Sequence, residues 1–350
     1  MKTIKDINVK NKTVLVRVDY NVPLKDGKVE SDLRIRASLP TLTYLREHGA
    51  KKIVLISHLG RPEGKDKSLS LRPAADALSK LISDISFIDD VSGPDVESAV
   101  DKLKNGAILL LENLRFFPGE EKNSEDFINE IIDTVGADLY VQDGFAVIHR
   151  AHASTDAVKN RLPVYAGLLL ENEIKNLDLA TKNPAHPVLL IIGGAKVEDK
   201  QPLIDKFLNQ ADQIVVGGKI AADGYQPSSD KIYVAEDFDE NAAGEKLDIG
   251  PISANKVTDY IKNAKTIIWN GLLGYAEDSA YATSSTIAAI TIGENTGASS
   301  IICGGDTAGF VENLMKSHKN LNYTLISTGG GASLEYLLGK SLPGLEAIEE

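Results

Sequence analysis

The sequence predicts an α/β fold of two doubly wound, parallel-sheet (Rossmann-like) domains joined by an interdomain helix. The chain has 350 residues, of which 43% are hydrophobic, which is enough for two domains with separate cores. Short apolar runs recur along it, each followed by a small or glycine-rich loop, and amphipathic segments lie between them. Runs that are apolar throughout are typical of strands buried on both faces, as in a parallel sheet covered by helices.

The first half contains the earliest of these units. A strand is predicted over Lys52–Ser57, followed by the loop His58–Arg61. Pro73–Ile82 is amphipathic and begins with proline at a plausible first helical position. Residues 168–183 have helical apolar spacing and lead into two prolines. We expect this last segment to be the interdomain helix, with the hinge near its ends.

The second half repeats the strand-then-glycine unit more often. Twenty of the 29 glycines lie beyond residue 160. Ligands of open α/β sheets bind at the carboxyl ends of the strands, so these glycine loops are candidate sites by position. The predicted strands are Val188–Ile192, Gln213–Val216, Thr266–Trp269, Ser300–Cys303 and Tyr323–Ser327, and the predicted helices are Lys200–Leu208 and Ile252–Lys262.

Composition and charge argue against several classes of protein. The formal net charge is −12, which argues against a bulk electrostatic role on nucleic acid or anionic lipid. The single Cys303 forms no internal disulfide and the six histidines follow no zinc-ligand spacing, so we expect a reducing compartment, with the cytosol as default. The apolar runs are too short for a bilayer, and we expect neither a signal peptide nor a transmembrane helix.

Arginine is distributed unevenly along the chain. All nine arginines fall within the first 161 residues. A planar guanidinium suits a bidentate grip on carboxylate or phosphate, whereas glycine loops bring backbone N–H groups close to phosphate oxygens. The asymmetry therefore predicts two anionic ligands, one per half. The alternative explanation for the uneven distribution of arginine is drift in whether lysine or arginine is used, without a functional cause.

Two common nucleotide-binding motifs are absent. The only near match to a Walker phosphate loop ends at Gly339–Ser341, and Leu334 stands where its first glycine is required. The dinucleotide pattern that begins at Gly329 fails at the same leucine. A conventional P-loop or dinucleotide-binding function is therefore not predicted.

Nine short segments carry the more specific signal. They are Arg17–Pro23, Leu33–Ile35, Ser57–Pro62, Leu111–Phe116, His149–Ser154, Gly193–Lys200, Trp269–Gly271, Gly304–Thr307 and Ser327–Glu335. Taken together and in this order, they resemble the phosphoglycerate kinase family. Any one segment is weak, but nine in the correct order leave little room for chance.

The resemblance implies reversible transfer of a phosphoryl group from 1,3-bisphosphoglycerate to ADP, giving 3-phosphoglycerate and ATP. It implies magnesium bound with the nucleotide, hinge closure to bring the two ligands together, and a cytoplasmic, monomeric protein. The nucleophile of the reverse reaction is a carboxylate, which is already ionised at neutral pH and needs no general base. Catalysis is then expected from positioning and charge neutralisation.

The resemblance also divides the chain into four segments. It implies an N-terminal phosphoglycerate-binding domain over residues 1–160 and a hinge with the interdomain helix over 161–183. A nucleotide-binding domain is expected over 184–333. The last segment, 334–350, is expected to be a tail that returns to the N-terminal domain.

A phosphoglycerate site is implied in the first half. Asp19 needs a separate account, because a carboxylate beside anions is repulsive unless it contacts the substrate hydroxyl or orients an arginine. The resemblance favours the hydroxyl contact. It also implies that Arg34 is a catalytic residue. The implied substrate-binding residues are Asp19, Asn21, Arg34, His58, Arg61, Arg115 and Arg150.

A nucleotide site is implied in the second half, with Lys196 and Gly330 as further catalytic residues. Lys196 and Lys200 are four residues apart and follow a glycine turn, so we expect them on one face of a helix. Asp306 is expected to hold magnesium, and Thr307 to begin a helix. The implied nucleotide-binding residues are Lys200, Glu277, Gly304, Gly305, Asp306 and Thr307.

The sequence departs from the family mainly beside this nucleotide site. It is short by a few dozen residues between positions 217 and 251, where only residues 222–246 remain. The family's Trp-Asn-Gly-Pro-Met-Gly is here Trp269–Gly274, with two leucines in place of proline and methionine. Two hypotheses follow: an active, compact phosphoglycerate kinase, or a catalytically weak relative that binds 3-phosphoglycerate in a binding or regulatory role.

Overall fold

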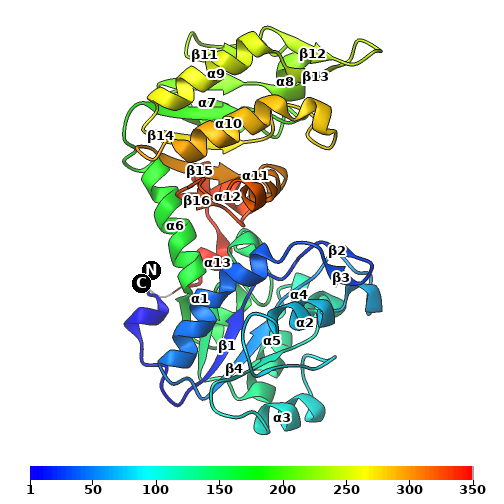
Figure 1. Cartoon of the computed structure of the whole chain (residues 1–350). Helices are drawn as coiled ribbons and strands as arrows, with labels where there is room; N and C mark the ends of the chain where they lie inside the picture. The colour runs from blue at the N-terminus through cyan, green and yellow to red at the C-terminus, as the bar shows by residue number, and fades with distance from the viewer. Residues whose placement is uncertain (349–350) are drawn as a thin grey trace. The chain divides into compact units, whose positions relative to one another are not determined.

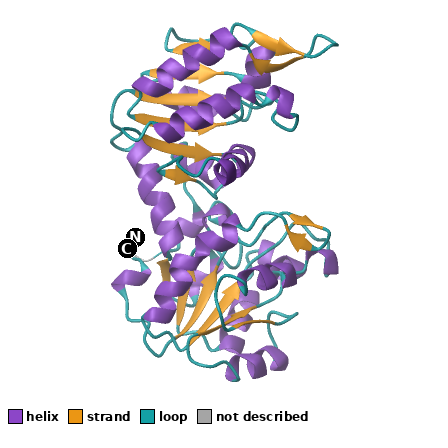
Figure 2. Ribbon diagram, in the orientation of Figure 1, coloured by secondary structure: helices purple, strands orange, loops and turns teal. Residues whose placement is uncertain are grey.

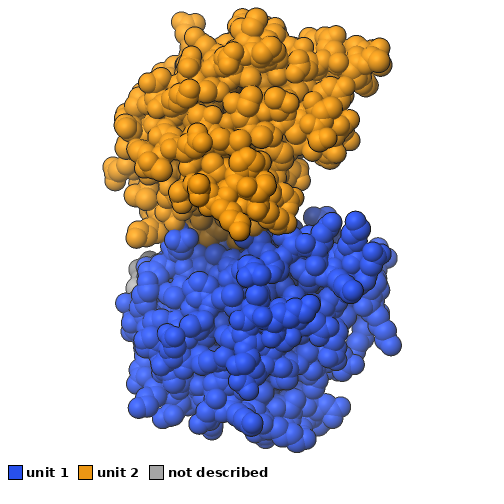
Figure 3. Space-filling model, viewed as in Figure 1, with its two compact units in different colours: residues 1–172, 341–350 blue, residues 173–340 orange. Residues whose placement is uncertain are grey.

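The computed structural model describes residues 1–348 and divides into two compact units (Figure 3). The first unit comprises Met1–Asn172 together with the chain from Ser341 on, and the second comprises Glu173–Lys340. Each unit contains one six-stranded sheet in which every pairing is parallel, packed against helices (Figure 2). The predicted pair of doubly wound α/β domains is confirmed.

The sheet of the first unit has the strand order β5-β6-β4-β1-β7-β8 (Figure 1). The central strand β1 is buried at all five positions, as expected for a strand covered on both faces. A separate antiparallel hairpin pairs β2, Leu24–Lys25, with β3, Lys28–Val29. The sheet strands are β1 Thr13–Arg17, β4 Lys52–Ile56, β5 Ile85–Phe87, β6 Ala107–Leu110, β7 Leu139–Gln142 and β8 Val164–Ala166.

Local signals mark both ends of one helix in the first unit, α5. In α5, Ser124 caps the N-terminus by accepting a bond from the Phe127 amide, and Gly136 ends the helix with a φ of 61°. The helix predicted from Pro73 begins at Arg72 but stops at Leu78. The helices are α1 Leu33–Glu47, α2 Arg72–Leu78, α3 Pro94–Asp101, α4 Pro118–Glu121, α5 Glu125–Val135 and α13 Pro343–Glu346.

The sheet of the second unit has the order β11-β10-β9-β14-β15-β16, which by chain position is 3-2-1-4-5-6. The order reverses between β9 and β14, and the crevice at such a switch point is where ligands bind in open α/β sheets. The strands are β9 Val188–Ile192, β10 Gln213–Val216, β11 Ile232–Val234, β14 Thr266–Asn270, β15 Ser299–Cys303 and β16 Leu325–Ile326, with a separate hairpin of β12 Phe238–Glu240 and β13 Lys246–Ile249.

The helices of the second unit follow these strands. The strand predicted over residues 323–327 is only two residues long, whereas the other four predicted strands match to within one residue. The region expected to be shortened contains β11, a short strand at the edge of the sheet, and β12 of the separate hairpin. The helices are α7 Gln201–Phe207, α8 Gly218–Ala222, α9 Pro251–Asn263, α10 Thr283–Glu294, α11 Gly305–Ser317 and α12 Gly331–Leu337.

The helix α6, Leu168–Thr181, carries the chain from one unit to the other, and the boundary between the units falls after Asn172. Residues 341–348 pack with the first unit. There the Gly344 amide donates to the Ile148 carbonyl oxygen at 2.8 Å. Residues 334–340 belong to the second unit. Across residues 1–348, none of the helices combines the length and apolar character that a membrane span requires.

Candidate functional site

Arg17 and His58 form the buried centre of a basic cluster in the first unit. Arg17 is the last residue of β1, and its Nε donates to Ser154 Oγ at 2.8 Å. Its Nη2 lies 3.1 Å from His58 Nδ1, so this ring nitrogen is assigned as the acceptor and Nε2 carries the proton. Burial, followed by the charge of Arg17, lowers the pKa of His58 well below 6.5. His58 is therefore neutral at physiological pH and offers one N–H donor.

Asp19 and Asn21 follow β1 and hold Arg34 in place. Arg34 donates from Nη1 to Asp19 Oδ2 at 2.6 Å and to the Asn21 carbonyl oxygen at 3.2 Å. The Asp19 side chain is 3% exposed, so this charge-assisted pair is largely removed from water. Asn21 Oδ1 accepts a bond from the Gly60 amide at 2.9 Å. Asp19 thus orients an arginine, which is one of its two expected roles, and its contact with a substrate hydroxyl stays a prediction.

Arg115 carries the clearest sign of an anion site. Its residue is only 7% exposed, and burial lowers the pKa of its guanidinium to about 10. Nη1 donates to the Gly60 carbonyl oxygen, and Nε lies 3.3 Å from a carboxylate oxygen of Glu121. Nη2 is buried without a hydrogen-bond partner among the described residues. Because an unpaired buried donor is costly, an anion that accepts from Nη2 stabilises the site.

Arg150 and Arg61 complete the predicted set. The charge of Arg150 lowers the pKa of both Arg115 and His58, so Arg150 belongs to the same electrostatic cluster. Its side chain is half-buried, and Nε lies 3.4 Å from His149 Nε2. Arg61 follows Gly60 and is exposed. The structure therefore brings six of the seven predicted residues into one connected group and leaves Arg61 at the surface beside it.

The buried groups that support this cluster were not predicted. Arg17 and Ser154 lie at the ends of the Arg17–Pro23 and His149–Ser154 segments but are not among the expected site residues, and Glu120 lies in none of the nine segments. Ser154 donates from Oγ to Glu120 Oε1 at 2.6 Å and from its amide to Oε2 at 3.1 Å. Burial raises the pKa of Glu120, against the charge of Arg17. The available signal was a charged residue, Arg17, at the carboxyl end of an apolar run.

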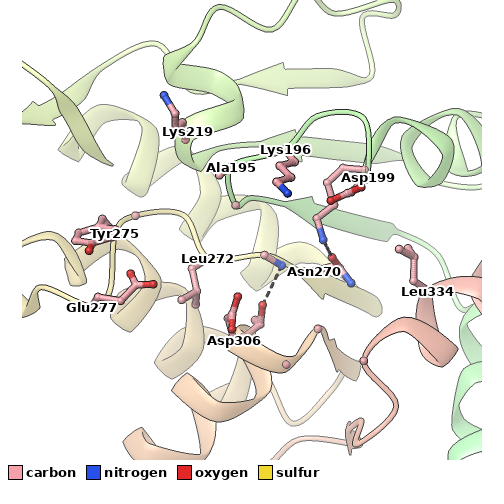
Figure 4. A pocket seen from close by; sticks show the side chains of 18 of the residues that line it. Ala195, Lys196, Asp199, Lys219, Asn270, Leu272, Tyr275, Glu277, Asp306 and Leu334 are labelled. Carbon is pink, nitrogen blue, oxygen red and sulfur yellow. Dashed lines mark hydrogen bonds between the residues drawn. The ribbon is translucent and has the colours of Figure 1, made fainter. Parts of the chain in front are cut away.

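A cavity of about 700 Å³ opens in the second unit, at the carboxyl ends of β9, β14 and β15 (Figure 4). At its floor, the backbone of the loop after β9 lies very close to the backbone of the loop after β14. A Cβ on Gly271 would lie 2.2 Å from the Gly193 carbonyl oxygen, and one on Gly193 would lie 2.1 Å from that of Leu272. Only glycine allows the two loops to approach this closely. The cavity thus occupies the switch point of the sheet.

Lys196 and Lys200 both line this cavity. Lys200 donates to Asn270 Oδ1, and burial lowers the pKa of its ammonium. The expected shared helix face is wrong. Helix α7 begins only at Gln201, so Lys196 lies in a loop and Lys200 in the turn before the helix. The loop is held to its neighbour by the Gly194 amide, which donates to the Leu272 carbonyl oxygen at 2.8 Å.

The loop after β15 supplies the predicted Gly304–Thr307 segment. Gly304 has a φ of 91°, a left-handed conformation that favours glycine. Helix α11 begins at Gly305, two residues earlier than expected, so Thr307 lies in its first turn. Thr307 Oγ1 accepts a bond from the Gly271 amide at 2.9 Å and keeps its own hydrogen as a donor. Asp306 is exposed and lines the cavity.

Gly330 and Glu277 also line the cavity. Gly330 precedes α12 and has a φ of 51°. Figure 4 shows Glu277 beside Tyr275 at one end of the cavity, with Asp199 and Leu334 at the other end and Asp306 between them. The structure therefore gathers all the predicted nucleotide-binding residues around one space.

The carboxylates of the cavity suit a metal that arrives with its ligand. Within residues 1–348, no group of three or more histidine, cysteine, aspartate or glutamate side chains is placed to hold a metal ion. Magnesium is commonly held by one or two carboxylates together with substrate phosphates and water. Asp306 fits that requirement as an exposed carboxylate that lines the cavity together with lysines and glycines.

Comparisons with known proteins assign this chain to a family. The family model for phosphoglycerate kinase matches residues 4–226 and 223–340. The phosphoglycerate kinase of Moorella thermoacetica is 40% identical over 395 aligned positions, which cover 99% of this chain and 99% of that protein. The 395 positions exceed the 350 residues of this chain. The two family matches meet at residues 223–226, inside the region expected to be shortened.

Solved structures agree in fold. The crystal structure of phosphoglycerate kinase from Pyrococcus horikoshii matches with a TM-score of 0.87 and 29% identity, covering 99% of this chain and 98% of that one. The structure of phosphoglycerate kinase from Coxiella burnetii matches with a TM-score of 0.79 and 31% identity over the same shares. The buried basic cluster and the glycine-lined cavity thus occur in a chain that belongs to the phosphoglycerate kinase family.

Proposed function

We propose that this chain transfers a phosphoryl group reversibly between the acyl phosphate of 1,3-bisphosphoglycerate and ADP, producing 3-phosphoglycerate and ATP. One observation carries this proposal: a chain of this family has two candidate anion-binding sites of different kinds, one in each unit. One is a buried guanidinium cluster with an unpartnered N–H on Arg115, and the other is a glycine-lined cavity with two lysines. The reaction needs both, because its two ligands are a small phosphorylated acid and a nucleotide.

The basic cluster suits the phosphorylated acid. Guanidinium groups bind phosphate and carboxylate oxygens through directed, charge-assisted bonds, so they fix orientation as well as affinity. The paired Asp19 holds Arg34 at a defined position, which a catalytic arginine requires. Neutral His58 adds an N–H donor without adding charge. We propose the full predicted set, including exposed Arg61, as the residues that bind phosphoglycerate.

The cavity suits the nucleotide phosphates. Lys196, Lys200 and the amides around Gly304 and Gly330 surround one space, and such groups stabilise charge on a transferred phosphoryl group. We propose that Asp306 holds magnesium together with the nucleotide phosphates. When bound, magnesium neutralises phosphate charge.

The chemistry needs no general base from this chain. In the reverse direction the attacking carboxylate is ionised at neutral pH. Burial and the surrounding arginines keep the pKa of His58 far below that range, so His58 acts as a fixed donor. We assign charge neutralisation to Arg34 and Lys196. Because the two proposed ligands bind different units, we propose that hinge closure brings them together for transfer.

The alternative, a weak relative with a binding role, is not favoured, because the chain keeps Lys196, Lys200, Glu277, Asp306 and Thr307 around the cavity. A cytosolic location and a monomeric state stay predictions.

The test is a coupled assay of ATP formation from 1,3-bisphosphoglycerate and ADP. The wild-type chain should turn over, and Arg34→Ala should lower kcat on the order of a hundredfold or more while leaving ADP affinity nearly unchanged. Arg36→Ala is the matched control, because Arg36 lies on the same helix but is exposed and pairs with Asp32. Equal losses in the two variants, or equal losses of kcat and ADP affinity, would contradict the role of Arg34. A wild-type chain that binds 3-phosphoglycerate by calorimetry but shows no turnover would favour the alternative.

A further inference from the structure

The end of the cavity occupied by Tyr275 and Glu277 differs chemically from the phosphate end. Lys196, Lys200, Asp306 and the glycine amides gather around the β9, β14 and β15 loops. At the end away from Asp199 and Leu334, Figure 4 shows Tyr275 and Glu277. Leu247, which also lines the cavity, lies beside Tyr275 because its carbonyl oxygen accepts a bond from the Tyr275 amide. A cavity of about 700 Å³ is within the range of small-ligand sites. A molecule whose phosphates lie beside Lys196 and Lys200 therefore extends its remaining portion toward Tyr275.

Tyr275 is unusual among the aromatic residues of this chain. It is 52% exposed, and among the described residues its side chain has no hydrogen-bond, ring or cation partner. The two lysines at this end are engaged elsewhere. Lys219 Nζ lies 2.8 Å from Asp223 Oδ1, and Lys246 Nζ lies 4.7 Å from the centre of the Phe238 ring. The exposed face of Tyr275 is thus the free recognition surface at this end.

The backbone of Tyr275 is fixed even though its ring is exposed. Its amide donates to the Leu247 carbonyl oxygen at 2.7 Å, and its own carbonyl accepts from the Asp278 amide at 3.2 Å. The preceding Gly274 forms an antiparallel bridge with Asp248, and a Cβ there would lie 2.2 Å from Asp248 Oδ1. A side chain on such a rigid loop loses little conformational entropy on binding.

We propose that Tyr275 is the base-stacking residue of the nucleotide site, and that it accepts purine bases through their faces. This inference rests on the proposed function, which supplies the nucleotide. Stacking is tolerant of base identity because every base has a π-face. ADP and GDP should therefore both use this contact.

Calorimetric binding of ADP, GDP and inorganic tripolyphosphate to the full chain tests the proposal. Tyr275→Ala should weaken ADP and GDP about 5- to 150-fold and leave tripolyphosphate affinity unchanged, because tripolyphosphate has no base. Tyr275→Phe should bind both nucleotides nearly as the wild type does. Tyr275→Leu, which keeps an apolar side chain without a π-face, should lose most of the affinity that the alanine variant loses.

Each alternative result overturns the proposal in a recognisable way. Unchanged ADP affinity in Tyr275→Ala removes the stacking role. An equal loss for tripolyphosphate shows that Tyr275 only supports the loop. If Tyr275→Ala loses affinity for ADP but not for GDP, or if the wild-type chain does not bind GDP, the site does not recognise purines through the base face. Failure of the proposed function is separate, because it is the absence of ATP formation by the wild-type chain.

Discussion

The carboxyl group of Asp143 should make the stability of the first unit depend on pH. Asp143 is fully buried beside the start of α6, where its Oδ1 accepts bonds from the amides of Leu169 at 3.0 Å and Leu170 at 3.4 Å. Burial raises its pKa from 3.8 to about 7, against the lowering effect of hydrogen bonds from Thr41 and these amides. The perturbation is Asp143→Asn, which keeps an acceptor oxygen but removes the titration.

The sign and size of the pH effect on the free energy of unfolding follow from proton linkage. Between about pH 4 and pH 7 the folded chain keeps the Asp143 proton that the unfolded chain has lost, so the free energy of unfolding falls as pH rises through this window. The separation of the two pKa values corresponds to about 4 kcal/mol. In Asp143→Asn this residue does not titrate, so the variant lacks this decrease in the free energy of unfolding. Its free energy of unfolding relative to the wild type should therefore increase by up to about 4 kcal/mol from about pH 4 to about pH 8.

Urea unfolding of both proteins at several pH values, followed by far-UV circular dichroism, measures this difference. Trp269 is the only tryptophan and lies in the second unit, so its fluorescence reports that unit separately and should show no difference. Other titrating groups, including His58 and His152 with their lowered pKa values, cancel when the two proteins are subtracted. Parallel stability curves for the two proteins across this range would refute the reasoning.

Two further predictions concern the second unit. Gly271→Ala should destabilise it by several kcal/mol, because its Cβ would meet the Gly193 carbonyl oxygen. Gly309→Ala, inside α11 with open space around its Cβ, should instead stabilise it by about 0.5–1 kcal/mol. Thermal unfolding followed by Trp269 fluorescence should shift in opposite directions, and equal shifts would contradict the packing argument. Separately, Lys200→Met should weaken tripolyphosphate about 10-fold or more in calorimetry, whereas Lys206→Met, at an exposed position of α7, should not; indistinguishable affinities would remove Lys200 from the phosphate site.

The sequence was sufficient for the sheets and for most of the strands, because apolar runs bounded by glycine report burial directly. It was insufficient where the outcome depends on distant parts of the chain. The loop of Lys196 is held by a bond from the Gly194 amide to the Leu272 carbonyl oxygen. A glycine turn that is compatible with a helix therefore leads instead to a loop, and helix α7 begins only at Gln201. Local spacing alone does not show this contact.

The same limit explains the unpredicted buried groups of the basic cluster. Arg17 bonds Ser154, which lies 137 residues away, and His58, which lies 41 residues away. A charged residue at the end of a strand is normally expected at the surface. Its burial becomes apparent only when the carboxyl ends of β1 and β4 are side by side.

The position of β11 has a practical consequence for engineering this chain. It is the outermost strand of its sheet, and residues 226–228 just before it are exposed, whereas the loops that line the cavity follow the interior strands β9, β14 and β15. Exposed connections at a rim tolerate added sequence best. A reporter domain or affinity tag inserted at residues 226–228 would therefore leave the pairing of the interior strands unchanged.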